Sequence, residues 1–189
     1  MLIDLSVVVI GEQVQSFTEN GRIPSFGHLG THFDVMDKVF PLEFVRRQSV
    51  VFDVSNLFER DIDSSDIDLD QVEAGMFVLF CTGHIELQGY GTKAYSGNHP
   101  QLSMELMDEL LKRSVSMIGV DFAGVRRGKE HTLADQYCAD HGVFVVENVC
   151  NLALVLKNSK SRKCIIHTYP VNFKGWSGLP CRVVAEIDE

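Results

Sequence analysis

The chain has 189 residues, and its 17 Lys and Arg against 26 Asp and Glu give a formal net charge of −9. Hydrophobic residues make up 45% and charged residues 23%, which is typical of a globular chain and predicts one domain over residues 1–189. An acidic chain without a local cluster of Lys and Arg repels phosphate backbones and anionic lipids, so no nucleic-acid or membrane partner is expected. No apolar run approaches the roughly 20 residues that a membrane-spanning helix needs.

The N-terminus and the cysteines indicate the compartment. The first residues lack the basic segment, the long apolar stretch and the small-residue cleavage site of a secretory signal, so we expect a cytoplasmic protein. Five cysteines are widely spaced and form no C-x-x-C pair, which favours reduced and mostly buried thiols.

Runs of apolar and β-branched residues predict several strands. In chain order these strands span residues 3–10, 45–54, 76–82, 117–122, 143–146, 164–173 and 182–187. Two helices are predicted over 103–113 and 132–141, with Ser103 and Thr132 as N-caps and Gly142 just after the second helix. The order strand, helix, strand around the second helix predicts a parallel crossover, and the acidic stretch 61–70 predicts an exposed loop. The fold class is therefore mixed α/β.

The segment 27–38 carries the most informative pattern of the chain. His28, His32 and Asp34 lie close together in it, and imidazoles and carboxylates are ligands of divalent metal ions. On a helix Asp34 would point away from the two histidines, and in a straight strand His28 and His32 would lie about 13 Å apart. A strand bent at Gly30 brings all three together. The alternative is a pair of hydrogen-bonded loop histidines that bind no metal.

The same segment resembles a known family. His28-x-Gly30-Thr31-His32-x-Asp34 is similar to the H-x-G-T-H-x-D core of the metal-dependent cyclase and kynurenine formamidase family. The resemblance extends over most of the chain, with similar segments at residues 3–6, 82–83, 90, 99–100, 102–103, 118–121, 147–148 and 178–182. It implies a compact swivelling β/β/α domain that assembles into a homo-oligomer, either a dimer or a tetramer.

The resemblance also implies a set of metal ligands. His28, His32 and Asp34 match the ligands of a first metal, and the aspartate bridges to a second metal held by the counterpart of Glu147 and by a downstream histidine. Asp135 occupies the position of that histidine and is either an oxygen ligand or an exposed helix residue. Zn²⁺ or Mn²⁺ is the expected cofactor, Fe²⁺ also accepts these ligands, and an oxygen-rich second site favours Mn²⁺ or Mg²⁺.

The chain departs from the family pattern at Lys38. The family continues its motif with a proline and a proton-shuttling histidine, and Met36 and Lys38 stand at these positions here. Lys38 acts as a catalytic base only if its pKa falls towards neutrality. The nearby carboxylates Asp34 and Asp37 raise that pKa instead, and a bound metal would counteract them. Two alternatives stay open for Lys38: a protonated group that holds an anionic substrate or an oxyanion, and a solvated surface lysine.

Other histidines and aromatic residues have weaker interpretations. His131 and His141 flank the position of the family's second-site histidine without keeping its spacing, and His141 is interpreted as a residue at a helix C-terminus. His84 and His99 border a glycine-rich loop and are not assigned as ligands. Trp176 either packs in the core or provides apolar surface for a ring-bearing substrate.

These observations favour a metal-dependent hydrolase that cleaves the C–N or C–O bond of a small amide, formamide, cyclic amide or lactone, as an arylformamidase does. The alternative is a non-catalytic homologue of the same fold that binds a metal or a small ligand.

Overall fold

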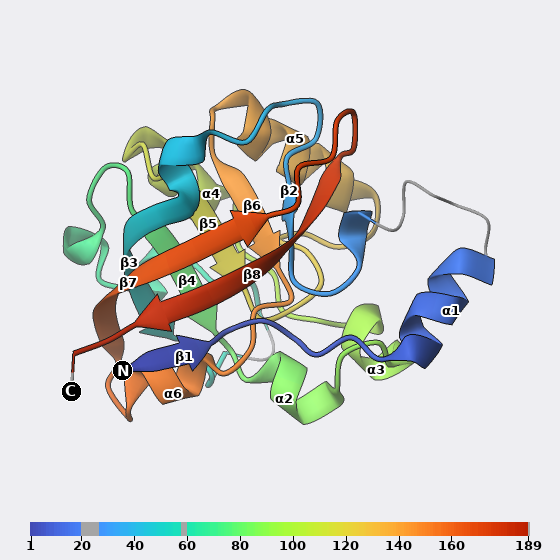
Figure 1. Cartoon of the computed structure of the whole chain (residues 1–189). Coiled ribbons are helices and arrows are strands. Elements are labelled where there is room, and N and C mark those ends of the chain that lie inside the picture. The colour runs from blue at the N-terminus through green and yellow to red at the C-terminus, as the bar shows by residue number, and fades with distance from the viewer. Residues whose placement is uncertain (20–26, 58–59, 189) are drawn as a thin grey trace.

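The computed structural model describes residues 1–19, 27–57 and 60–188, and within them it shows a mixed α/β fold built on one β-sheet (Figure 1). The strands span Leu2–Asp4 (β1), His32–Asp34 (β2), Arg46–Asp53 (β3), Phe77–Cys81 (β4), Met117–Val120 (β5), Phe144–Glu147 (β6), Ser161–Pro170 (β7) and Gly178–Glu186 (β8). The helices span Gly11–Glu19 (α1), His84–Gln88 (α2), Lys93–Gly97 (α3), Met104–Lys112 (α4), His131–Asp140 (α5) and Leu152–Leu156 (α6).

The sheet closes into a barrel of seven strands. Their order is β8-β2-β6-β5-β4-β3-β7, and β7 pairs with β8 to complete the ring, while β1 pairs with the end of β8. The four strands β3, β4, β5 and β6 are parallel, and the other pairings of the ring are antiparallel. The sheet is therefore mixed, and the expected α/β class is confirmed.

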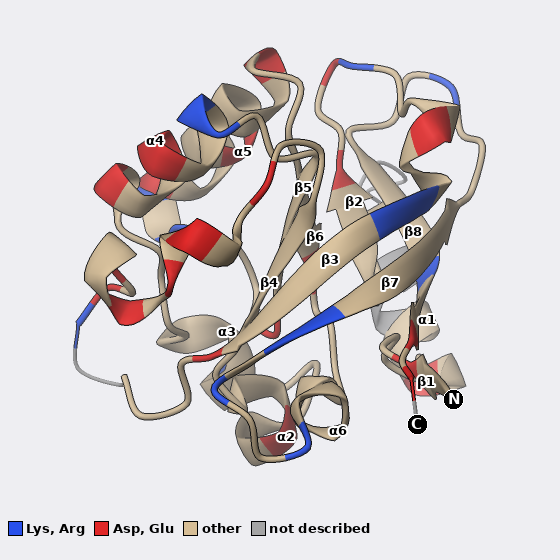
Figure 2. Cartoon of the chain, turned by 90° about the vertical axis from the view of Figure 1, so that its left-hand side faces the viewer, with Lys and Arg blue, Asp and Glu red and all other residues tan. Residues whose placement is uncertain are grey.

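Two apolar layers hold the barrel wall in place. Alternate residues of β4 point to opposite faces, so Phe77 and Leu79 lie in the barrel interior and Val78 and Phe80 lie in the outer layer. Helices α4 and α5 cover that outer face, on the side turned away from β7 and β8 (Figure 2). Burial on both faces explains why the parallel strands are continuous apolar runs in the sequence.

Most predicted elements are present with shifted ends. The predicted strand 3–10 is wrong beyond Asp4, and β1 ends there. Ser103 caps α4 as predicted, because its hydroxyl accepts a hydrogen bond from the Leu106 amide. The predicted N-cap at Thr132 is wrong: α5 begins at His131, directly after a 3₁₀ turn, and its N-cap residue Glu130 makes no side-chain cap. The parallel crossover from β5 through α5 to β6 is confirmed.

The acidic stretch 61–70 is only partly the exposed loop that its composition predicts. Its two isoleucines, Ile62 and Ile67, are buried in the outer apolar layer, and Ile62 forms a β-bridge with Leu102. The acidic residues around them form two 3₁₀ turns capped by Asp63 and Asp68. All five cysteines are free thiols, as expected, and no helix among the described residues is long and apolar enough to cross a bilayer.

Candidate metal centre

The candidate centre lies on the outer face of the barrel, where α5 packs against β6. His32 and Asp34 of β2 pair with Glu147 and Val145 of β6. Because side chains alternate along a strand, His32, Asp34 and Glu147 point out of the barrel, whereas Phe33 between the first two belongs to the barrel interior.

The first group of potential ligands consists of His28, His32 and Asp34. The His28 Nδ1 atom lies 3.2 Å from His32 Nε2 and 2.9 Å from Asp34 Oδ1, and His32 Nε2 lies 3.6 Å from Asp34 Oδ1. Gly30 has a φ of +72°, so the chain turns between the two histidines as the sequence predicts. A side chain at Gly178 would come within 2.8 Å of the His28 ring, so this neighbouring position requires glycine.

A second group shares Asp34 with the first. Asp34, His131, Asp135 and Glu147 each offer one ligand atom, and these atoms lie within 4.8 Å of one another. The His131 Nε2 atom lies 3.3 Å from Asp135 Oδ2 and 3.1 Å from Glu147 Oε1. One helical turn separates His131 from Asp135, so both side chains leave α5 on the same face.

The electrostatics of the two groups fit a bound cation. Asp34, Asp135 and Glu147 are almost fully buried. One carboxylate oxygen of Asp34 and one of Asp135 have no hydrogen-bond partner, and Oε1 of Glu147 has only its contact with the His131 ring. Burial and the charges of Asp34 and Glu147 raise the pKa of Asp135 to about 9, and burial beside Asp34 also raises the pKa of Glu147. Burial alone would lower the pKa of His32, but Asp34 and Glu147 raise it to about 9. Buried charges of this kind are stable when they are paired or coordinate a metal, and Zn²⁺, Mn²⁺ and Fe²⁺ accept mixed imidazole and carboxylate ligands.

Comparison with known proteins identifies the family of the chain. The sequence pattern of the family described as "Putative cyclase" matches residues 3–126. The chain belongs to this cyclase family. No curated protein matches its sequence.

Solved structures show the same fold as this cyclase-family chain at low sequence identity. A potential metal-dependent hydrolase with cyclase activity superposes with a TM-score of 0.73 at 18% identity, over 98% of this chain and 96% of its own. Isatin hydrolase A from Labrenzia aggregata, bound to benzyl benzoate, has a TM-score of 0.73 at 17% identity, over 98% and 93% of the two chains. A predicted metal-dependent hydrolase from Bacillus stearothermophilus has a TM-score of 0.72 at 19% identity, over 98% and 97%.

A series of hydrogen bonds on the Nδ1 side of His32 sets the orientation of its ring. His32 Nδ1 lies 2.9 Å from the Gly30 carbonyl oxygen, which also accepts a hydrogen bond of 2.8 Å from the Asn148 side-chain amide. The Tyr95 hydroxyl donates a hydrogen bond of 2.5 Å to the side-chain oxygen Oδ1 of Asn148. Since a carbonyl only accepts, Nδ1 of His32 carries a proton, and Nε2 is the ring atom turned towards the cluster, where a metal ion would replace its proton.

These hydrogen bonds predict an effect of Tyr95 on metal affinity. Tyr95→Phe removes the hydroxyl that fixes Asn148, and we expect about tenfold weaker metal binding in competition with a chromogenic chelator, with the fold retained by circular dichroism. Tyr137→Phe is the matched control, because the Tyr137 hydroxyl contacts Asp108 and none of the ligand groups. An unchanged metal affinity in Tyr95→Phe would show that the His32 ring is held by its own contacts alone.

Lys38 belongs to neither ligand group. Its Nζ atom lies 2.6 Å from Asp140 Oδ1 and 3.0 Å from Asp37 Oδ1. Hydrogen bonds to Asp140 and Asp37 raise the pKa of Lys38, so its amine is protonated at neutral pH. His84 and His99 are also outside the groups: His84 Nε2 lies 2.9 Å from the Tyr95 carbonyl oxygen, and His99 Nδ1 lies 2.7 Å from that of Pro100.

Of the residues proposed from the sequence, the structure brings together His28, His32, Asp34, Asp135 and Glu147. The group also contains His131, which sequence reasoning set aside because its spacing to Glu147 differs from the family pattern. The available signal was the helix itself, since a residue one turn before Asp135 must share its face. His141, by contrast, caps the C-terminus of α5 as predicted, and its Nδ1 lies 2.8 Å from the Tyr137 carbonyl oxygen.

Proposed function

We propose that this protein is a metal-dependent hydrolase that cleaves a C–N or C–O bond in a small amide, formamide, cyclic amide or lactone. The observation that carries the proposal is the pair of ligand groups sharing Asp34, with an unpartnered oxygen on each of the buried carboxylates of Asp34 and Asp135. The similarity of the fold to isatin hydrolases supports it, because isatin is itself a cyclic amide.

In this proposal His28, His32 and Asp34 hold one divalent ion, and Asp34, His131, Asp135 and Glu147 offer ligands for a second. A divalent ion in such a site lowers the pKa of water and polarises a carbonyl group. His28 and His131 are about one-third exposed, with 34% and 35% of their side chains accessible, whereas the other ligands are buried. The substrate therefore approaches along the edge formed by these two histidines.

The first test is the metal content of protein purified without added metal. We expect approximately stoichiometric Zn, Mn or Fe by elemental analysis and its loss in His32→Ala, because His32 lies at the centre of the first group. Lys38→Ala is the control and should retain the metal. Hydrolysis of formamides, cyclic amides or lactones should disappear with the metal, and full activity after complete metal removal would exclude the proposal.

The environment of Lys38 favours a second candidate function, a non-catalytic protein that binds a metal or a small ligand. The family's proton-shuttling histidine is replaced here by an ammonium group held between two carboxylates, which is a poor base.

Lys38→His separates the two functions. For a hydrolase we expect restoration of an imidazole to raise turnover about tenfold or more, while Lys38→Gln, which removes the ammonium without supplying a base, leaves it unchanged. The measurement is the hydrolysis rate of a panel of formamides and lactones at equal metal content. A metal-loaded Lys38→His protein that hydrolyses none of them would favour the binding function.

A further inference from the structure

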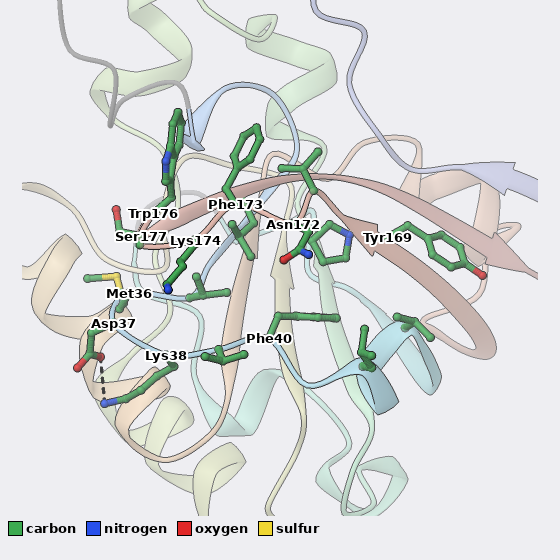
Figure 3. Close-up of a pocket in the computed structure, with 18 residues that line it drawn as sticks. Met36, Asp37, Lys38, Phe40, Tyr169, Asn172, Phe173, Lys174, Trp176 and Ser177 are labelled. Carbon is green, nitrogen blue, oxygen red and sulfur yellow. Dashed lines mark ion pairs between the residues drawn. The ribbon is translucent and has the colours of Figure 1, made fainter.

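A groove at the open end of the barrel is separate from both ligand groups. It lies between residues 35–45 and residues 169–177, which form the end of β7 and the hairpin connection to β8 (Figure 3). Its volume is about 1240 Å³. Small-molecule sites usually enclose about 300–1000 Å³, so the groove is large enough for a small-molecule ligand.

The floor of the groove is the apolar interior of the barrel. Val35 and Leu179 line it and belong to the interior core, and Met36, Phe40 and Trp176 pack partly buried against that core. Because Val35 lies one position after Asp34, its side chain points to the opposite face of the strand from the metal ligands. None of the residues of the two ligand groups lines the groove, although the lining residue Ser177 has its hydroxyl 3.0 Å from His28 Nε2.

Aromatic rings form much of the groove wall. Phe173 and Trp176 pack together on the hairpin side with ring centroids 4.6 Å apart, and Phe40 lies on the other side, 4.8 Å from Phe33. Such rings offer a large apolar surface to a flat or branched hydrocarbon body. Val39 and Leu42 extend the apolar surface at the rim, where both are exposed.

Three charged residues line the groove, Asp37, Lys38 and Lys174, and among these described residues only the charge of Lys174 is not balanced by an ion pair. Lys38 forms ion pairs with Asp37 and Asp140. Lys174 projects from the hairpin connection towards Met36 (Figure 3), and it makes no ion pair with any residue in the described part of the chain. A cation without a partner beside an apolar surface is complementary to a ligand with a hydrocarbon body and one negative charge.

We propose that this groove binds a small amphipathic anion, an aryl or branched alkyl carboxylate, with its apolar body against Phe40, Phe173 and Trp176 and its carboxylate at Lys174. The lining of the site contains none of the potential metal ligands, and the proposal does not rest on the proposed hydrolase function.

Trp176 is the sole tryptophan of the chain, so its fluorescence reports directly on the groove. The experiment is a titration of the full chain with 3-phenylpropanoate and with its neutral amide, with excitation at a wavelength that selects tryptophan. We expect a saturable change with the carboxylate, which binds on the order of threefold to fivefold more tightly than the amide. Lys174→Gln should abolish this preference and Phe173→Ala should weaken both ligands, whereas Lys93→Gln, at an exposed lysine on α3, should change neither.

The same titration on chelator-treated protein and on His32→Ala separates the groove from the metal centre, and binding should persist in both. A lack of any saturable change in Trp176 fluorescence, or equal binding of carboxylate and amide, would overturn the proposal. Sedimentation velocity provides the remaining check. Self-association that is lost in Phe173→Ala, together with no response to the carboxylate, would assign the groove to a contact between copies of the chain and would also overturn it.

Discussion

Asp135→Asn is expected to stabilise the metal-free protein although it removes a metal ligand. In the absence of a cation, Asp135 is buried beside the carboxylates of Asp34 and Glu147, and its pKa is raised to about 9 by burial and by these two charges. An acid whose pKa is higher in the folded state loses stability as the pH rises from its unfolded value near 4 towards 9. An asparagine is neutral throughout, so at neutral pH we expect a gain of about 2 kcal/mol in the free energy of unfolding.

The measurement is thermal denaturation of chelator-treated protein at neutral pH, where about 2 kcal/mol corresponds to an increase in Tm of about 4–8 °C. When metal is added the order should reverse, because the wild-type carboxylate gains a cationic partner and the amide does not. Asp140→Asn is the matched control: it removes the same charge from the same helix at an exposed position and should stay within about 0.5 kcal/mol of the wild type. If Asp135→Asn destabilises the metal-free protein, the carboxylate is stabilised by contacts within the fold and the argument for a cation at the second group fails.

Local sequence patterns predicted individual strands and turns of the fold. The apolar run 76–82 predicted β4 because a parallel strand buried on both faces needs apolar residues at every position. The turn at Gly30 could be anticipated because His28 and His32 converge only if the chain bends between them. Helices α2, α3 and α6 were not predicted, since five residues are too few to show a helical period.

The closure of the barrel depends on long-range pairing that no local pattern contains. Residues 178–180 of β8 pair with β2, and residues 181–186 pair with β7, so a single strand joins two edges of the sheet. The sequence predicted the class and the strands, and only the three-dimensional pairing reveals the seven-strand ring.

In the candidate centre too, the residues that are close in sequence were predicted, and the residues brought in by helix packing were left ambiguous or set aside. His28, His32 and Asp34 are close in sequence and were recognised from their spacing. Asp135 stayed ambiguous between a ligand and an exposed helix residue until the packing of α5 on β6 showed it buried beside Glu147. His131 joins the group only through the same helix packing, which places an imidazole one turn before the position that carries a histidine in the family.

His99 is expected to make the protein sensitive to mild acid. Its ring is buried and stacked on Phe122 with a centroid distance of 5.6 Å, and burial together with the charge of Arg127 lowers its pKa to about 4. A base whose pKa is lower in the folded state keeps its contribution to stability above its unfolded value of about 6.5 and loses it as the pH falls towards 4. The loss is about 1.4 kcal/mol for each pH unit in that window, so we expect about 2 kcal/mol between neutral pH and about pH 5.

The variant that tests this expectation is His99→Asn, whose side-chain amide can replace the Nδ1 hydrogen bond to the Pro100 carbonyl oxygen but does not titrate. The loss of the ring lowers the stability of this variant at every pH, so the comparison uses the change in the free energy of unfolding between the two pH values, measured by urea denaturation. We expect that change to be smaller in His99→Asn by about 2 kcal/mol. His167→Asn serves as the control, because His167 lies on β7, away from His99, and pairs with the exposed Glu186. If the free energy of unfolding changed equally with pH in the wild type and in His99→Asn, protonation of His99 would cost no stability. That outcome would contradict the effect expected from its burial against Phe122.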